Sequence, residues 1–260
     1  GLRVIAITDH DSTEGTPEAL EAARSFPGLR IIPGVELSTD VPGSEVHLLG
    51  YFVDYQNAEF QRILRRFREG RIERAHKMVE KLNELGVKVS WERVTELSGD
   101  GAIGRPHIAL AMVEAGYVHY PRDAFEQYLG RNGIAYVERP KLTPIEAIKI
   151  LVDNGATPVM AHPTYFASKS YGDDTTSLKQ IVQELKGAGL LGMEVYYGDY
   201  SKEQVKSLAG LADELGLVPC GGSDYHASGN PGEPQPGSVG PPIETVEMLE
   251  YLRVRGIASA

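Results

Sequence analysis

Five side chains that can bind a metal ion stand at or just beyond the ends of apolar runs in this sequence: His10, Glu36, His162, Asp224 and His226. Three imidazoles with two carboxylates form a mixed nitrogen and oxygen set, which suits Zn, Mn or Fe better than Mg or Ca. Such ions lower the pKa of bound water toward neutrality, and paired ions can clamp an in-line displacement at phosphorus. The set therefore favours a metal-dependent hydrolase.

Each of these residues, taken alone, also has a structural explanation. His10, between Asp9 and Asp11, could cap a helix, although these two carboxylates would also be natural partners for a ligand imidazole. Glu36 could pair with an arginine, and Asp224 could cap a turn. A shared site is favoured because four separate strand ends each carry a His, Asp or Glu.

Short apolar runs alternate with helix-like segments over much of the chain, a pattern typical of βαβ units and a parallel sheet. The expected strands cover residues 2–8, 30–38, 46–53, 157–160, 192–197 and 217–220. Carboxyl ends of parallel strands meet on one face of a barrel, so a closed or nearly closed α/β barrel would gather the metal-capable residues. His47 stands near the start of its strand instead. An antiparallel strand, or one entered from the rim, would bring it to the same face.

The middle of the chain breaks this rhythm. From Ala58 to Leu85 the apolar residues fall three or four apart, which predicts one long amphipathic helix that ends at Gly86. Shorter helical patterns follow it. We therefore expect a discontinuous barrel of residues 1–53 and 144–260 and a helical insertion domain of residues 54–143.

Composition excludes several classes of protein. The 260 residues are 42% hydrophobic and 24% charged, which is typical of a globular enzyme, and no apolar stretch is long enough to span a membrane. A single cysteine excludes a disulfide framework. The net charge of −10 argues against stable binding of duplex nucleic acid. No signal peptide is recognisable, so we expect a cytoplasmic protein.

Five motifs occur in order along the chain: Val4-Ile5-Ala6-Ile7-Thr8-Asp9-His10-Asp11, Pro33-Gly34-Val35-Glu36-Leu37-Ser38, His47-Leu48-Leu49-Gly50-Tyr51, Ala161-His162-Pro163 and Gly222-Ser223-Asp224-Tyr225-His226. Together they resemble the PHP (polymerase and histidinol phosphatase) family. The resemblance is closest to its 3′,5′-nucleotide bisphosphate phosphatases and a related 5′→3′ exoribonuclease.

The resemblance implies a distorted, TIM-like (β/α)7 barrel with up to three divalent ions, Mn, Zn or Fe, at the strand ends. It assigns six metal ligands: His10, Glu36, His47, His162, Asp224 and His226. Glu36 would bridge two ions, and His10, Glu36 and Asp224 would be catalytic. The implied reaction is hydrolysis of a nucleotide-like phosphate monoester or diester by metal-activated hydroxide.

This sequence departs from the family pattern at its start. The family carries a His-x-His pair on its first strand, followed by an Asp or His, and this chain contains neither. We therefore expect an N-terminally truncated barrel. In that form we expect metal to bind poorly and activity to be low or absent.

Substrate contacts are expected in the insertion. Gly104-Arg105-Pro106-His107 opens a helix, where the planar guanidinium of Arg105 and the helix N-terminus suit a phosphate group. Arg105 and His107 are therefore candidate phosphate ligands, although a surface Arg and a packed His explain the motif equally well. Tyr196, Tyr197 and Tyr225 could stack on a nucleobase or simply pack at the rim.

Two further interpretations stay open. An amidohydrolase-like enzyme that cleaves C–N bonds would also use a barrel with a His and Asp metal site. Alternatively, the chain could be an inactive barrel that serves as a structural module. The Arg105 motif and the excess of basic residues over residues 58–88 favour phosphate as the substrate group.

Overall fold

The chain forms two compact units, described here from a computed structural model that covers residues 1–41, 44–99, 101–138, 142–167, 178–226 and 231–258. The first unit comprises Gly1–Gln61, Lys141–Asp224 and Pro234–Ala260. The second comprises Arg62–Pro140 and Tyr225–Glu233. The first junction between the two units follows Gln61, inside a helix.

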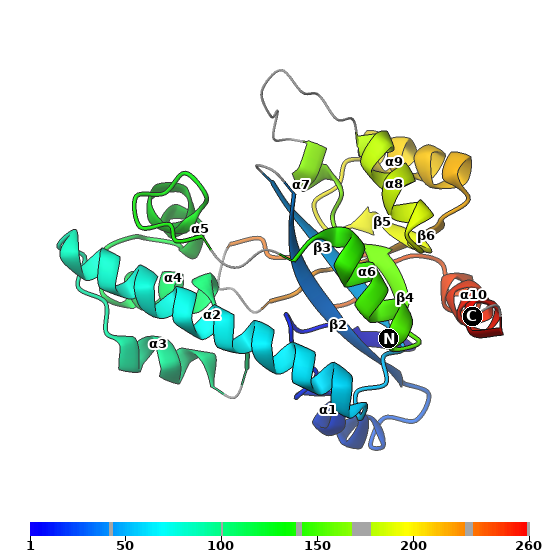
Figure 1. The fold of residues 1–260 in the computed structure, drawn as a ribbon, viewed down its shortest axis with the longest axis horizontal. Coiled ribbons are helices and arrows are strands. Elements are labelled where there is room, and N and C mark those ends of the chain that lie inside the picture. The colour runs from blue at the N-terminus through cyan, green and yellow to red at the C-terminus, as the bar shows by residue number, and fades with distance from the viewer. Residues whose placement is uncertain (42–43, 100, 139–141, 168–177, 227–230, 259–260) are drawn as a thin grey trace. The chain divides into compact units, whose positions relative to one another are not determined.

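The first unit is built on a six-stranded sheet that curls into a half-barrel, with strand order β1-β2-β3-β4-β5-β6 (Figure 1). The strands are β1 Val4–Ile7, β2 Arg30–Val41, β3 Ser44–Tyr51, β4 Thr157–Met160, β5 Gly192–Tyr197 and β6 Val218–Gly222. Strand β3 is antiparallel to both β2 and β4, whereas the other neighbours are parallel. The antiparallel direction considered from the sequence for the strand of His47 is therefore the observed one, in a sheet whose other neighbours are parallel as expected. Among the described strands, β1 and β6 are the edges, so these strands do not form a closed barrel.

Six helices lie wholly within the described part of the first unit: α1 Thr16–Ala23, α6 Pro144–Asp153, α7 Thr164–Ala167, α8 Leu178–Gly187, α9 Lys202–Leu215 and α10 Glu244–Ala258. Among them, α6 and α9 begin with a capping box. Ser201 caps α9 by accepting a hydrogen bond from the Gln204 N–H, and Gly216 ends the helix in the left-handed conformation. Helix α6 packs against β3 and β4. A Cβ at Gly50 of β3 would lie 2.3 Å from Leu151 of α6, so only glycine allows this close packing.

The second unit is helical and has its own apolar core. Its elements are most of α2 Ala58–Glu84, which begins in the first unit, then α3 Trp91–Ser98, α4 Arg105–Glu114, α5 Pro121–Ala124 and the π-helix η1 Phe125–Leu129. Met78 and Leu82 of α2 pack with Ile108 and Met112 of α4 and with Leu129. Burial of these apolar faces holds the short helices together.

The longest described helix, α2, has 27 residues and carries charged side chains along its exposed face. Nowhere in the described parts of the chain is a helix both long and apolar enough to cross a lipid bilayer.

Candidate metal centre

Glu36 lies at the centre of the candidate site in the first unit. It stands in the middle of β2, opposite Leu49 of β3, and is only 4% exposed. Three imidazoles surround its carboxylate. Its Oε1 lies 2.6 Å from Nδ1 of His47 and 3.4 Å from Nε2 of His162, and its Oε2 lies 3.6 Å from Nδ1 of His10.

Three different strands bring these imidazoles to Glu36. His10 comes three residues after β1 and forms an isolated bridge with Glu36, and His162 comes two residues after β4. His47 stands near the start of β3, opposite Ser38 of β2. Because β3 runs antiparallel to its neighbours, its beginning lies beside their carboxyl ends. The antiparallel placement considered from the sequence therefore explains His47.

The contacts fit a metal site better than a network of hydrogen bonds. The rings of His10 and His47 lie 5.1 Å apart and those of His47 and His162 lie 5.0 Å apart, all edge to face. Donor atoms of Glu36, His47 and His162 lie within 4.8 Å of one another. Nδ1 of His47 is buried, and although it lies close to Glu36 it has no aligned hydrogen-bond partner among the described residues. A cation between these donors would satisfy it.

The Glu36 carboxylate and the neighbouring imidazoles stabilise each other's charged forms. Burial alone would raise the pKa of the Glu36 carboxyl, but the surrounding imidazoles outweigh burial and hold that pKa well below its ordinary value. Burial opposes a charge on His162, yet the Glu36 carboxylate raises the pKa of this imidazole overall. Glu36 is therefore ionised at neutral pH and suited to bind a cation.

Backbone strain is concentrated at the candidate site. Among the described residues, four other than glycine have a positive φ: Asp11, Phe52, His162 and Asp224, with φ of 51°, 60°, 26° and 50°. Such conformations cost free energy and cluster at functional sites. His162 and Asp224, at the ends of β4 and β6, are both predicted metal ligands.

Asp11, one of the two aspartates that flank His10, contacts the neighbouring strand β2. The carboxylate of Asp11 is buried and accepts a hydrogen bond from the Ser38 N–H at 3.3 Å. The Ser38 hydroxyl lies 3.4 Å from Nδ1 of His10. Asp11 thus supports the part of β2 that contacts His10.

Two buried residues of β5 belong to the same region: Glu194 was not singled out from the sequence, and the contact that Tyr197 makes was not predicted. The Glu194 carboxylate accepts a hydrogen bond from the His162 N–H, and the Tyr197 hydroxyl donates to Oδ2 of Asp224. Burial raises the pKa of the Glu194 carboxyl to about 8 and also raises the pKa of the Tyr197 hydroxyl, which therefore keeps its proton. The available signal was a Glu inside the apolar run Gly192–Tyr197. Because Tyr197 is buried, its ring is not free to stack on a nucleobase.

The other predicted residues belong to the second unit. His226 stands two residues beyond Asp224, and its N–H donates to the Glu233 carboxylate at 2.9 Å. Arg105 begins α4, with its guanidinium over the Phe125 ring. Nδ1 of His107 accepts a hydrogen bond from the Gly104 N–H at 3.1 Å. Burial and then the charge of Arg71 lower the pKa of His107. Their roles as metal and phosphate ligands stay predictions.

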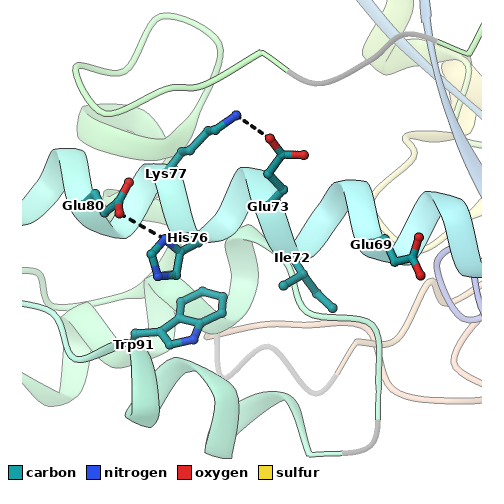
Figure 2. A pocket seen from close by; sticks show the side chains of 7 residues that line it. All are labelled: Glu69, Ile72, Glu73, His76, Lys77, Glu80 and Trp91. Atoms are coloured by element: carbon teal, nitrogen blue, oxygen red, sulfur yellow. Dashed lines mark hydrogen bonds and ion pairs between the residues drawn. The ribbon is translucent and has the colours of Figure 1, made fainter.

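An open pocket of about 530 Å³ lies on the second unit (Figure 2). Seven residues line it, and none is a predicted site residue: Glu69, Ile72, Glu73, His76, Lys77, Glu80 and Trp91. Glu73 pairs with Lys77 and His76 with Glu80 along the exposed face of α2. Both pairs join residues one turn apart on the same helix, and neither is directed at a common ligand position.

Comparison with known proteins decides the family. The chain is 33% identical over 223 residues to the 5′–3′ exoribonuclease Rnm of Salmonella typhimurium, covering 85% of this chain and 74% of that protein. The chain belongs to the PHP family of metal-dependent phosphoesterases. This PHP chain is also 31% identical over 230 residues to a 3′,5′-nucleoside bisphosphate phosphatase of Chromobacterium violaceum, covering 88% and 79% of the two chains.

Solved structures agree with this family. The PHP chain matches a protein of Bifidobacterium adolescentis, provisionally assigned as a metal-dependent phosphoesterase, with a TM-score of 0.85 and 30% identity over 97% of this chain and 86% of the other. It also matches a C. violaceum protein named an amidohydrolase, solved with sulfate and without metal, with a TM-score of 0.82 and 30% identity over 96% and 86%. No protein-family model matches the chain.

Proposed function

We propose that this PHP chain hydrolyses a phosphate ester of a nucleotide-like substrate, such as a 3′,5′-nucleoside bisphosphate or the 5′ end of a short RNA. One observation carries the proposal: a buried, ionised Glu36 with three imidazoles between 2.6 and 3.6 Å from its oxygens. The names of the relatives, an exoribonuclease and a bisphosphate phosphatase, support the choice of substrate.

Glu36, His10, His47 and His162 would hold the metal, with Asp224 and His226 completing the set. The nitrogen-rich donors suit Mn, Zn or Fe, and we propose a site for up to three ions. Bound ions supply water of lowered pKa and neutralise negative charge that develops at phosphorus. Glu36 and Asp224 contribute the carboxylates that bind the cations.

Arg105 and His107 would hold the substrate phosphate. Nδ1 of His107 accepts the Gly104 N–H, so in the neutral ring the proton is on Nε2, which can donate to a phosphate oxygen. The guanidinium of Arg105 can donate two parallel hydrogen bonds, and the N-terminus of α4 adds partial positive charge.

Metal content and turnover together test the proposal. The 260-residue chain and a version extended at its N-terminus are loaded with Mn²⁺ or Zn²⁺, and the bound metal is counted by ICP-MS. Phosphate release is then measured from a 3′,5′-nucleoside bisphosphate. We expect two to three ions per extended chain, and fewer on this one.

Variants assign the activity to the site. Glu36→Ala and Asp224→Ala are expected to abolish turnover in the extended protein. Glu18→Gln removes one exposed carboxylate of α1 and serves as the control. Full phosphatase activity in Glu36→Ala would refute the proposal.

A C–N hydrolase is the second candidate, because one matched structure is named an amidohydrolase. The same metal-loaded protein, given amide substrates in place of phosphate esters, separates the two. If neither the 260-residue chain nor the extended version binds metal, only the structural-module interpretation is left.

A further inference from the structure

Strand β5 lies between the two strands whose ends carry His162 and Asp224. It pairs with β4 on one side and with β6 on the other, both in parallel (Figure 1). No predicted metal ligand stands on β5. Its buried polar side chains, Glu194 and Tyr197, contact the two neighbouring strand ends instead.

A bulge brings Glu194 and Tyr197 to the same region. The two are three residues apart, so in a regular strand their side chains would point to opposite faces. The register with β6 shifts here: Glu194 pairs with Cys220, whereas Tyr196 pairs with Gly221. The extra residue on β5 interrupts the alternation of side chains between the two faces of the sheet. The side chain that follows is therefore turned to the other face, as at bulges beside functional sites.

Glu194 supports the backbone at His162. Its Oε2 lies 2.8 Å from the backbone nitrogen of His162. Glu194 is buried and His162 is nearly buried. His162 has a φ of 26°, which an L residue rarely adopts. A hydrogen bond to this N–H offsets part of the strain and fixes the direction in which the imidazole leaves the chain.

Tyr197 supports the side chain of Asp224. Its hydroxyl, on a ring that is 5% exposed, lies 2.7 Å from Oδ2 of Asp224, and the hydroxyl of Tyr165 lies 3.2 Å from it. A phenol has one proton, and Tyr197 gives it to the carboxylate, so Tyr165 donates to Tyr197. This hydrogen bond restricts rotation of the Asp224 carboxylate.

We propose that Glu194 and Tyr197 are positioning residues, which hold His162 and Asp224 in the orientation that binds the metal. The inference rests on the proposed function, because it assigns a role toward the metal that His162 and Asp224 are proposed to bind. Groups that orient metal ligands typically change metal affinity 10- to 100-fold when they are removed.

Tyr197→Phe tests the contact with Asp224, with Tyr200→Phe as a matched control. The Tyr200 ring packs 4.9 Å from that of Tyr197, but its hydroxyl accepts from the Thr164 N–H. Mn²⁺ affinity is measured by equilibrium dialysis of the full chain with ICP-MS. We expect Tyr197→Phe to bind Mn²⁺ roughly 10-fold more weakly or worse, and Tyr200→Phe to bind like the unmodified protein.

A pair of substitutions at Glu194 tests the contact with His162. Glu194→Gln keeps an oxygen that can accept from the His162 N–H, whereas Glu194→Met has a similar length and no such acceptor. We expect weaker Mn²⁺ binding in the Met variant and largely restored binding in the Gln variant. Tyr197→Phe and its control Tyr200→Phe each remove only one hydroxyl. Their comparison therefore tests the proposal even where Glu194→Met lowers stability.

The outcomes separate this inference from the proposed function. If neither the unmodified 260-residue chain nor its N-terminally extended version binds metal, both proposals are overturned. Metal binding by the unmodified chain that Tyr197→Phe and Glu194→Met leave unchanged would overturn the positioning role alone. Equal losses in Tyr197→Phe and Tyr200→Phe would show general packing, and would also overturn it.

Discussion

Glu194 makes the metal-free protein less stable as the pH rises. Its pKa is about 8 in the folded chain, against 4.5 for an unperturbed carboxyl, because the group is buried. The folded state therefore binds more protons than the unfolded state between these pH values. Each unit of pKa difference is worth about 1.4 kcal/mol, so the free energy of unfolding falls by up to about 5 kcal/mol from pH 4.5 to pH 8.

Glu194→Gln removes this dependence, because the amide does not ionise and keeps the shape of the side chain. We expect the variant to match the unmodified protein near pH 4.5 and to become progressively more stable than it up to pH 8. Urea unfolding of EDTA-treated protein, followed by far-UV circular dichroism at several pH values, measures the difference. Trp91, the only tryptophan, lies in the second unit, so its fluorescence does not report on Glu194 directly.

Other groups titrate over the same range, and those that do not interact with Glu194 cancel in the difference because both proteins contain them. His162 interacts with Glu194, so its titration is part of the measured difference. Glu18→Gln controls for the loss of an exposed carboxylate and should follow the unmodified protein. Parallel pH profiles for Glu194→Gln and the unmodified protein would refute the assignment of a protonated, buried Glu194.

Three further predictions concern the bulge, the metal site and the phosphate contact. Gly221→Ala should lower the free energy of unfolding by about 3 kcal/mol, because the new Cβ would lie 1.8 Å from the Tyr196 carbonyl oxygen, whereas Gly222→Ala meets nothing within 4 Å; equal urea midpoints would contradict this. His47→Asn should lower Mn²⁺ affinity at least about 10-fold, and unchanged dialysis results would exclude His47 as a ligand. Arg105→Lys keeps the charge but loses the planar fork, so KM for a 3′,5′-nucleoside bisphosphate should rise about tenfold with kcat little changed; an unchanged KM would remove Arg105 from the phosphate site.

Local patterns in the sequence predicted most elements of the fold. The apolar runs at 157–160 and 192–197 are β4 and β5 with the expected bounds, and the three- and four-residue spacing from Ala58 predicted α2 to within one residue of its end. These elements are readable because periodicity and end signals are properties of adjacent residues. Helices α7, α8 and α10 were not predicted.

The residues around Glu36 could also be identified from the sequence, because metal-capable side chains occur at several strand ends. That they meet at one site could not be predicted with certainty, since it depends on strand direction. His47 reaches Glu36 only because β3 is antiparallel to β2 and β4, and hydrogen bonds between distant strands determine that direction.

The sequence by itself determined the types of the candidate ligands, their order along the chain and the family resemblance, all of which are carried by short motifs. Only the tertiary structure decided which groups support those ligands. Glu194 differs from its neighbours only as a carboxylate within an apolar strand, and Tyr197 was considered either for base stacking or for packing at the rim. Both act through partners about 30 residues away, and they reach them because a bulge, made possible by Gly221 on the next strand, alters the alternation of β5. Such contacts depend on register between strands, which no local pattern encodes.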